Sequence, residues 1–283
     1  MKYRLLVLDI DGTVTNTEKK VTPRTKAAIK KLQEQGTLVA IASGRPTRGI
    51  APVADELEFD KYGSYVLAFN GARIVNWKTK ECIYSKTLPL GMPRKLYRSA
   101  VRHEVGIITY EEEQIIAGTT PDIYMETESR ITGLPICYRQ DFPNYVNFPV
   151  NKCLLTGEPD ELERIEPLLA EEYLHEAQIF RSEPFFLEAT PKNVDKAYCL
   201  EKLLKLLGIS REEMVCCGDG YNDISMIQFA GLGGSYGKCP GKGEKDVADY
   251  ITVRSNDEDG VEEVIEKFFL ERIIRRESMP LHF

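Results

Sequence analysis

Residues 3–13 of the chain read Tyr3-Arg-Leu-Leu-Val-Leu-Asp9-Ile-Asp11-Gly12-Thr13. The apolar run at 5–8 predicts a short strand that is buried on both faces of a sheet. Asp9 and Asp11 follow this run directly, and Gly12 permits a sharp turn after them. Ligands of open α/β sheets bind beyond the carboxyl ends of the strands, so we expect the two acids where such a fold has its site. Because neighbouring carboxylates repel each other, the pair also indicates a bound cation.

The composition indicates a globular protein of two domains. The chain has 283 residues, of which 42% are hydrophobic and 29% charged, and this length exceeds one ordinary core. No apolar run approaches the ~20 residues that cross a bilayer, so we expect no membrane segment. Asp9 interrupts the first apolar run, which therefore predicts a strand and not a secretion signal.

The cysteine content and the net charge indicate in which compartment the protein is found and which kinds of partner it binds. The seven cysteines are an odd number without paired metal-type spacing, which favours a reducing cytoplasm. Cys216 and Cys217 lie in an apolar run and are predicted to be buried small hydrophobes. The net charge of -7 argues against nucleic acid as the main partner, but it leaves room for a small phosphorylated ligand.

Strands and helices alternate at both ends of the chain. We predict strands at 5–8, 38–42, 65–69, 214–217 and 250–253, and helices at 22–36, 46–57, 194–207, 224–230 and 260–274. This alternation predicts an α/β fold with a parallel sheet and right-handed crossovers.

The middle of the chain has a different texture. We predict strands at 81–88, 107–110, 114–117, 136–139, 152–156, 177–181 and 185–188, and helices at 94–104 and 159–173. Regular βα alternation is missing there, so an α+β domain is predicted at residues 84–188, inserted into a core of residues 1–83 and 189–283.

Further polar residues follow the predicted parallel strands. Ser43, Asp219 and Asp223 lie at or just beyond strand ends, and Lys196 lies near the start of a helix, where the backbone dipole favours anions. Carboxylates that hold a hard cation next to a hydroxyl and an amine suit a phosphoryl group. Mg²⁺ is the expected cation because it takes carboxylate, water and phosphate oxygens.

At this point the chain resembles the haloacid dehalogenase superfamily. Four ordered motifs carry the resemblance: Asp9-Ile-Asp11-Gly12-Thr13, Ser43, Lys196 and Gly218-Asp219-x-x-Asn222-Asp223. The insert resembles the α/β cap of the Cof-type branch, which contains sugar-phosphate phosphatases. The stretches 42–45, 70–72 and 256–261 also look like that branch. The implied fold is a Rossmann-like parallel-sheet core with an inserted cap of the C2 type.

The resemblance also implies roles for individual residues. Asp9 would attack phosphorus and form an aspartyl-phosphate, and Asp11 would act as general acid and then as general base. Thr13 would help to hold Asp11. The implied Mg²⁺ ligands are Asp9, Asp11 through its carbonyl, Asp219 and Asp223. The implied residues around the substrate phosphoryl group are Ile10, Thr13, Ser43, Gly44, Arg45, Asn70, Lys196 and Asn222.

The expected activity is hydrolysis of a small phosphomonoester, such as a sugar phosphate or a cofactor phosphate, with the cap choosing the leaving group. A phosphomutase shares the chemistry, except that a sugar accepts the phosphoryl group. A phospho-accepting signalling receiver also has a strand-end aspartate, a hydroxyl and a lysine, but Asp11 would speed hydrolysis there. The sequence gives neither the substrate nor the oligomeric state.

Two stretches permit other interpretations. Asp9-x-Asp11-Gly12 could begin a calcium loop, but a strand precedes it and the later acids of an EF-hand are missing. Residues 231–245 depart from the branch pattern and are rich in Gly and Lys. Because no Gly-x-x-x-x-Gly-Lys-Ser/Thr spacing occurs in that stretch, it predicts a flexible surface loop and not a phosphate-binding loop.

Overall fold

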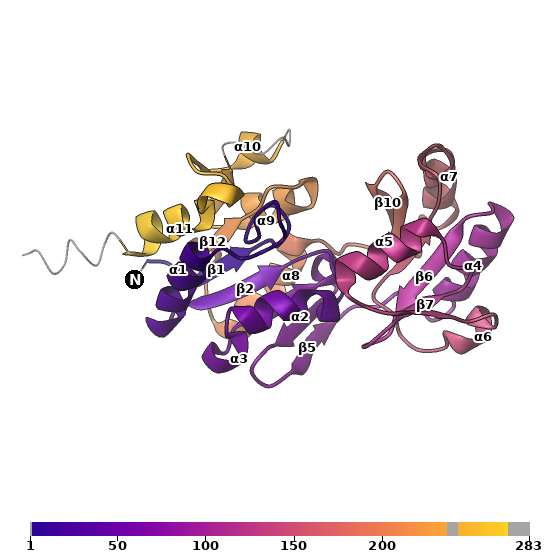
Figure 1. Cartoon of the computed structure of the whole chain (residues 1–283), viewed down its shortest axis with the longest axis horizontal. Coiled ribbons are helices and arrows are strands. Elements are labelled where there is room, and N and C mark those ends of the chain that lie inside the picture. Colours follow the sequence, from indigo (N-terminus) through magenta and orange to yellow (C-terminus); the bar gives the residue numbers. More distant parts are fainter. Residues whose placement is uncertain (1, 237–242, 271–283) are drawn as a thin grey trace, which may run out of the picture. The chain divides into compact units, whose positions relative to one another are not determined.

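The structure, a computed structural model, describes residues 2–236 and 243–270 (Figure 1). The chain forms two compact units. The larger unit holds the chain up to Ser43, Pro52–Ile83 and the chain from Asp195 onward, and the smaller unit holds Gly44–Ala51 and Tyr84–Val194. The smaller unit thus continues past residue 188, because the strand β11 (Phe186–Thr190) belongs to its sheet.

The larger unit is built on an eight-stranded sheet. Its strand order is β14-β13-β12-β1-β2-β3-β4-β5, with bounds β1 (Leu5–Leu8), β2 (Leu38–Ala42), β3 (Tyr65–Ala68), β4 (Arg73–Asn76), β5 (Glu81–Ser85), β12 (Met214–Cys217), β13 (Leu232–Tyr236) and β14 (Tyr250–Thr252). All pairs from β14 to β3 are parallel, and β4 runs antiparallel to β3. The predicted α/β fold with a parallel sheet is confirmed.

The register of the sheet brings two predicted site segments together. Leu8, the last residue of β1, lies opposite Cys217, the last residue of β12. All four residues of β1 are buried, as a central strand covered on both faces requires. The residues that follow β1 and β12 therefore leave the sheet side by side.

Several helices of this unit contact one another. The structure has α1 (Pro23–Glu34), α2 (Thr47–Glu56, which begins in the smaller unit), α3 (Phe59–Tyr62), α8 (Lys196–Leu207), α9 (Ile224–Phe229), α10 (Glu244–Val247) and α11 (Gly260–Ile265). Helix α1 contacts α11, and α8 contacts α9 (Figure 1). Thr22 caps α1 by accepting from the Thr25 N–H, and Pro23 takes its first position, as predicted.

The predicted closing helix at 260–274 is shorter in the structure. Helix α11 ends at Ile265, and Glu266–Leu270 continue as a π-helical turn. Residues 271–274 of that prediction lie outside the described residues.

The smaller unit has its own six-stranded sheet. Its strand order is β10-β11-β9-β6-β7-β8, with β6 (Gly106–Tyr110), β7 (Ile115–Ala117), β8 (Ile136–Tyr138), β9 (Cys153–Thr156) and β10 (Gln178–Glu183) joining β11. Its helices are α4 (Met92–Arg102), α5 (Ile123–Thr132), α6 (Phe142–Tyr145) and α7 (Pro159–Glu172). Leu96, Ile107, Leu155 and Leu187 lie in one shared apolar core. The unit is α+β, with only the β7–β8 pair parallel.

Helix α5 has no counterpart in the sequence prediction. Asp122 caps it by accepting from the N–H groups of Tyr124 and Met125. Its buried residues are Met125, Glu128 and Thr132. Since only one of these three is apolar, hydrophobic periodicity gives almost no signal for this helix.

The prediction of a surface loop at 231–245 is wrong for its first part. Residues Leu232–Tyr236 form β13, which lies between β12 and β14. The sequence did not predict this strand because it contains Gly233 and Gly234, and glycine disfavours strands. A Cβ on Gly233 would lie 2.4 Å from the Ile227 carbonyl oxygen, so close packing of α9 requires glycine there. Residues 237–242 lie outside the described residues.

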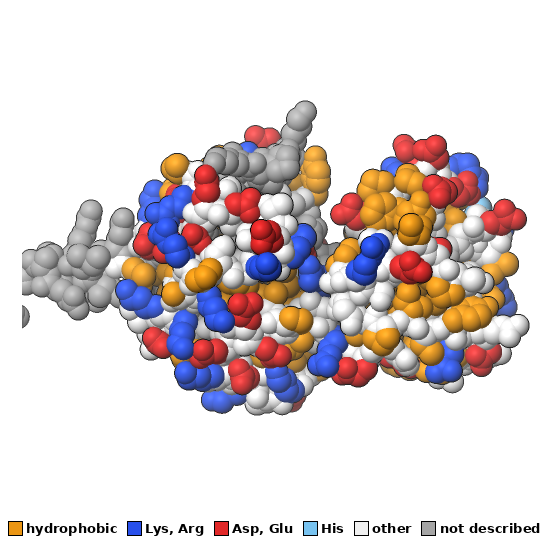
Figure 2. Space-filling view, viewed as in Figure 1, with side chains coloured by type: hydrophobic (Ala, Val, Ile, Leu, Met, Phe, Trp, Pro, Cys, Tyr) orange, Lys and Arg blue, Asp and Glu red, His pale blue; other side chains and the backbone are white. Residues whose placement is uncertain are grey.

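Two sequence expectations concern burial and surface. Cys216 and Cys217 are buried, as predicted. In the described ranges, every helix is too short or too polar to span a bilayer. Figure 2 shows Lys and Arg side chains interspersed with Asp and Glu over the visible face of the larger unit.

Candidate active site

Three carboxylates meet beyond the carboxyl ends of β1 and β12. Asp9 follows β1, and Asp219 and Asp223 follow β12. One carboxylate oxygen from each of the three lies within 4.8 Å of the others. The Asp9 N–H donates to the Cys217 carbonyl at 3.0 Å, so the parallel pairing of the two strands continues up to the first acid.

Lys196 supplies the positive charge in this cluster. It is the first residue of α8 and its side chain is fully buried. Its Nζ donates to Asp9 Oδ1 at 2.6 Å and also to Asp223 Oδ1. Asp195 fixes the start of the helix by accepting from the Tyr198 N–H at 2.7 Å, which places Lys196 at the cluster.

Asp223 also shapes the turn that carries Asp219. Its Oδ2 accepts from the N–H groups of Asp219 at 3.0 Å and Gly220 at 2.9 Å. A Cβ on Gly218 would lie 2.4 Å from the Cβ of Asp223, so this turn has room only for glycine. The motif spacing thus reflects a turn folded around one of its own carboxylates.

Gly12 makes room for Asp219. Its φ is +82°, and a Cβ in its place would lie 2.1 Å from Asp219 Oδ2. The sequence predicts that Thr13 supports Asp11, but its hydroxyl donates to Asp219 Oδ1 at 3.0 Å. The Gly12-Thr13 pair therefore positions the carboxylate that follows β12.

The cluster carries more negative than positive charge. Burial, together with the charge of Asp223, raises the pKa of Asp9 well above its usual range. Burial and Asp223 also raise the pKa of Asp219 to about 6. Burial alone would lower the pKa of Lys196, but Asp223 and Asp9 outweigh it and raise that pKa. One ammonium does not balance three carboxylates, so the donor set fits a hard divalent cation such as Mg²⁺.

A second group of predicted residues lies on neighbouring turns. Ser43, which is buried, accepts at its carbonyl from the Asn70 N–H at 3.0 Å. Asn70 has a left-handed backbone, with φ 54°, and its Oδ1 accepts from Asn222 Nδ2 at 3.1 Å. The turn after β3 is thereby joined to the turn that carries Asp219 and Asp223.

The remaining predicted residues have other surroundings. Asp11 forms an ion pair with Lys19, with Nζ 2.9 Å from Oδ1. The Ile10 side chain is fully buried, so only its backbone is available to a ligand. Gly44 and Arg45 belong to the smaller unit, where Arg45 donates to the Gly49 carbonyl at 3.3 Å.

Sequence reasoning missed Lys19 as the partner of Asp11. A lysine eight residues after an acid forms no recurring motif, and the segment between them contains neither helix nor strand. Nothing in the sequence marks this pair before the loop is seen folded.

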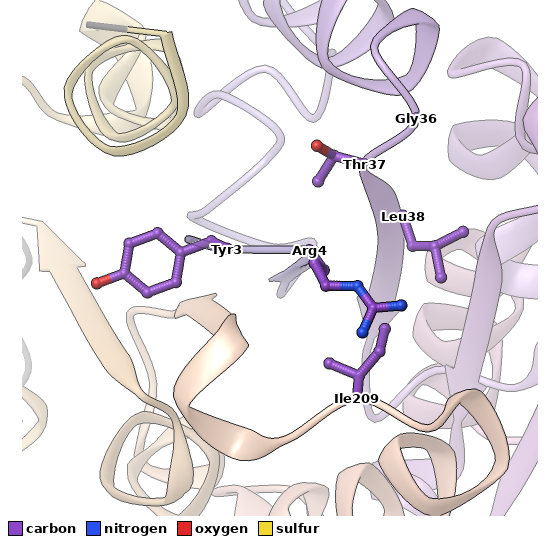
Figure 3. A pocket seen from close by; sticks show the side chains of 6 residues that line it. All are labelled: Tyr3, Arg4, Gly36, Thr37, Leu38 and Ile209. Atoms are coloured by element: carbon purple, nitrogen blue, oxygen red, sulfur yellow. The ribbon is translucent and has the colours of Figure 1, made fainter. Parts of the chain in front are cut away.

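A separate pocket lies at the opposite ends of the strands (Figure 3). Its lining residues are Tyr3, Arg4, Gly36, Thr37, Leu38 and Ile209. Arg4 directly precedes β1 and Leu38 begins β2, so this pocket lies at the amino ends of the strands. None of the candidate site residues lines it.

Comparison with known proteins gives consistent similarities. The family model described as haloacid dehalogenase-like hydrolase matches residues 6–265. A 5-amino-6-(5-phospho-D-ribitylamino)uracil phosphatase of Bacillus subtilis, YcsE, is 27% identical over 94% of this chain and 96% of its own length.

Solved structures extend these similarities to the fold. A haloacid dehalogenase-like hydrolase from Bacteroides thetaiotaomicron has a TM-score of 0.91 and 42% identity, and the match covers 95% of this chain and 100% of that one. The subclass IIB sugar phosphatase BT4131 has a TM-score of 0.78 and 25% identity, with 94% of this chain and 99% of that one covered.

Proposed function

This chain belongs to the haloacid dehalogenase-like hydrolases and is a phosphatase, and on this premise we propose that it hydrolyses small phosphomonoesters with Mg²⁺ through a phosphorylated Asp9. The observation that carries the proposal is the meeting of Asp9, Asp219 and Asp223 around the buried Lys196. Phosphoryl transfer needs a positioned nucleophile and compensation of the phosphoryl charge, and this cluster offers both.

Asp9 is the proposed nucleophile. Its carboxylate oxygen forms a bond to phosphorus while the bond from phosphorus to the leaving oxygen breaks, and Asp11 donates its proton to that oxygen. A water then attacks phosphorus and gives its proton to Asp11. The bond between Asp9 and phosphorus breaks, and inorganic phosphate leaves.

The residues proposed to hold Mg²⁺ are Asp9, Asp219, Asp223 and the backbone carbonyl of Asp11. When bound, the ion supplies positive charge that keeps the acids ionised and compensates the phosphoryl oxygens. Lys196 adds a fixed ammonium in contact with Asp9 and Asp223. The phosphoryl oxygens are assigned to Ser43, Lys196 and Asn222, with Ile10, Thr13, Gly44, Arg45 and Asn70 completing the proposed set.

The proposed domain roles use the bounds expected from the sequence, whereas the smaller compact unit also includes Gly44–Ala51 and extends to Val194. Residues 1–83 and 189–283 form the catalytic core, and residues 84–188 form the cap that selects the leaving group. The substrates that we propose are sugar phosphates or cofactor phosphates. Two of the similar proteins support this choice, since one is named a sugar phosphatase and the other a phosphatase of a phosphoribitylamino compound.

A panel of phosphorylated metabolites, assayed with and without Mg²⁺, tests the proposal. We expect Mg²⁺-dependent release of inorganic phosphate from at least one sugar or cofactor phosphate, and no release by Asp9→Asn, because an amide is a poor nucleophile. Isomer formation without phosphate release would identify a phosphomutase. Full activity of Asp9→Asn would remove Asp9 as the nucleophile.

A further inference from the structure

The turn at residues 256–259 contacts the loop that follows the first motif. Asp257 accepts from Thr17 twice: Oδ1 accepts from the N–H at 2.8 Å and Oδ2 from the hydroxyl at 2.7 Å. Asn256 Nδ2 donates to the Thr15 carbonyl at 3.1 Å. These bonds join residues about 240 positions apart, and we call residues 14–20 the acid loop.

The acid loop is in turn connected to Asp11. Thr15 donates to the Ile10 carbonyl through its N–H at 3.0 Å and through its hydroxyl at 2.8 Å. Thr15 also forms a bridge with Asp11, and Lys19 pairs with the Asp11 carboxylate. The backbone and the side chain of Asp11 are therefore both held by residues of this loop.

The acid loop lacks the regular hydrogen bonding of a helix or a strand. Two backbone bonds close the loop on itself, from the Asn16 N–H to the Lys20 carbonyl and from the Lys19 N–H to the Asn16 carbonyl, both at 2.9 Å. The Thr17 N–H donates to Asp257 instead, so this carboxylate ties the closed loop to the C-terminal segment. Asp257 is exposed, yet both of its carboxylate oxygens are directed at one residue of the loop. A carboxylate that accepts two bonds from one residue fixes that residue in orientation as well as in place.

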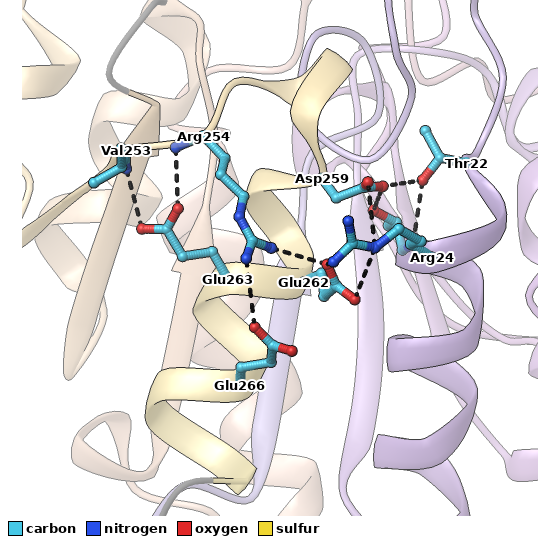
Figure 4. Close-up of polar contacts among 9 residues, drawn as sticks. Thr22, Arg24, Val253, Arg254, Asp259, Glu262, Glu263 and Glu266 are labelled. Carbon is cyan, nitrogen blue, oxygen red and sulfur yellow. Dashed lines mark hydrogen bonds and ion pairs between the residues drawn. The ribbon is translucent and has the colours of Figure 1, made fainter.

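The neighbouring polar contacts, drawn in Figure 4, involve the start of α1 and the C-terminal segment instead of the acid loop. Asp259 accepts from the hydroxyls of Thr22 and Thr25 at the start of α1. Arg254 pairs with Glu262 and Glu266 within the C-terminal segment. These contacts join α11 to α1 or brace α11 itself, and none of them reaches the acid loop.

From this arrangement we propose that Asp257 is a positioning residue for the reaction: by holding Thr17 it fixes the acid loop and so places the Asp11 carboxylate for proton transfer. The inference rests on the proposed function, in which Asp11 protonates the leaving oxygen. Asp257, which lies near the other end of the chain, would thereby affect how efficiently Asp11 transfers its proton.

The test compares two leaving groups. p-Nitrophenolate leaves without a proton, whereas the alkoxide of a sugar needs one, and kcat/KM reports the steps up to departure of the leaving group. The probes are p-nitrophenyl phosphate and the sugar phosphate that the wild-type protein hydrolyses fastest. Asp257→Ala is expected to lower kcat/KM for the sugar phosphate by about tenfold, a fraction of what general acid catalysis contributes. The loss for p-nitrophenyl phosphate is expected to be much smaller.

Two further variants bracket this result. Thr17→Val keeps the N–H bond but loses the hydroxyl bond, so it should show the same selective loss to a lesser degree. Arg254→Ala removes ion pairs next to the turn without touching the acid loop, and it should leave the ratio of the two kcat/KM values unchanged. Equal losses for both substrates in Asp257→Ala, or a changed ratio in Arg254→Ala, would overturn the proposal.

Asp11→Asn separates this inference from the proposed function. Among these variants, Asp11→Asn should show the largest loss of kcat/KM for the sugar phosphate relative to p-nitrophenyl phosphate. If Asp11→Asn shows this selective loss and Asp257→Ala does not, the positioning proposal alone fails. If Asp11→Asn loses both activities equally, the acid role of Asp11 fails and the positioning proposal falls with it.

Discussion

Gly12→Ala should damage the site far more than the fold. The φ of Gly12 is +82°, and an L-residue in this region costs about 1–2 kcal/mol. The new Cβ would also lie 2.1 Å from Asp219 Oδ2, whereas an ordinary contact is at least 3.4 Å, so the carboxylate must retreat by about 1.3 Å. A shift of this size would remove Asp219 from its proposed place as a metal ligand, which should cost about 10²-fold in kcat/KM.

Gly36→Ala is the matched control. Gly36 has nearly the same φ, +84°, but nothing lies within 4 Å of its hypothetical Cβ. The strained φ alone should lower the Tm of both variants by a few degrees, since about 1 kcal/mol corresponds to roughly 2–4 °C in a protein of this size. Gly12→Ala should lower Tm further, because it also displaces the carboxylate that accepts from Thr13. Only Gly12→Ala should lose phosphate release and Mg²⁺ affinity, measured by kinetics and calorimetry. If the two variants released phosphate at the same rate, the close contact between Gly12 and Asp219 would be refuted.

Three further predictions address the other parts of the site. Lys196→Met leaves Asp9 and Asp223 buried without their ammonium partner, so urea unfolding of the metal-free protein should show a loss of about 3–5 kcal/mol in unfolding free energy. The control Lys205→Met breaks an exposed ion pair and should change the unfolding free energy little. Equal losses in the two variants would contradict the buried pairing of Lys196. Asp11→Asn should slow phosphate release by about 10²-fold or more. Calorimetry should still show Mg²⁺ binding to this variant, because the backbone carbonyl remains. Loss of Mg²⁺ binding would indicate that the Asp11 side chain is itself needed to bind the metal. Chelation with EDTA should abolish phosphate release and added Mg²⁺ should restore it, whereas full activity in EDTA would exclude the metal.

The sequence predicted the parts of the molecule that have a local signal. The run at 5–8 and its acids predicted both a buried central strand and a ligand site, and the structure brings Asp9 and Asp219 together there. Lys196 could be placed near a helix start because apolar residues from Ala197 to Leu207 recur at helical spacing, although the helix begins at Lys196 and not at residue 194. These features depend on short stretches whose physics is contained in neighbouring residues.

The features that were missed depend on distant contacts. Strand β13 is held by its two neighbours and by close approach to α9, so its two glycines contradict local strand propensity. The pairing of Thr13 with Asp219 joins residues 206 positions apart. The contacts of Asp257 with Thr17 are just as distant, and only the folded chain shows what the stretch 256–261 holds.

Asp223 is an example of a residue that has no substitute. One oxygen shapes the turn by accepting from two N–H groups, and the other faces the lysine. An asparagine has one acceptor and one donor, so either orientation would set an NH₂ group against the turn or against the ammonium. Laboratory evolution toward another metal or another substrate should therefore leave this position unchanged and accumulate its substitutions elsewhere, because turn geometry and charge cannot vary independently here.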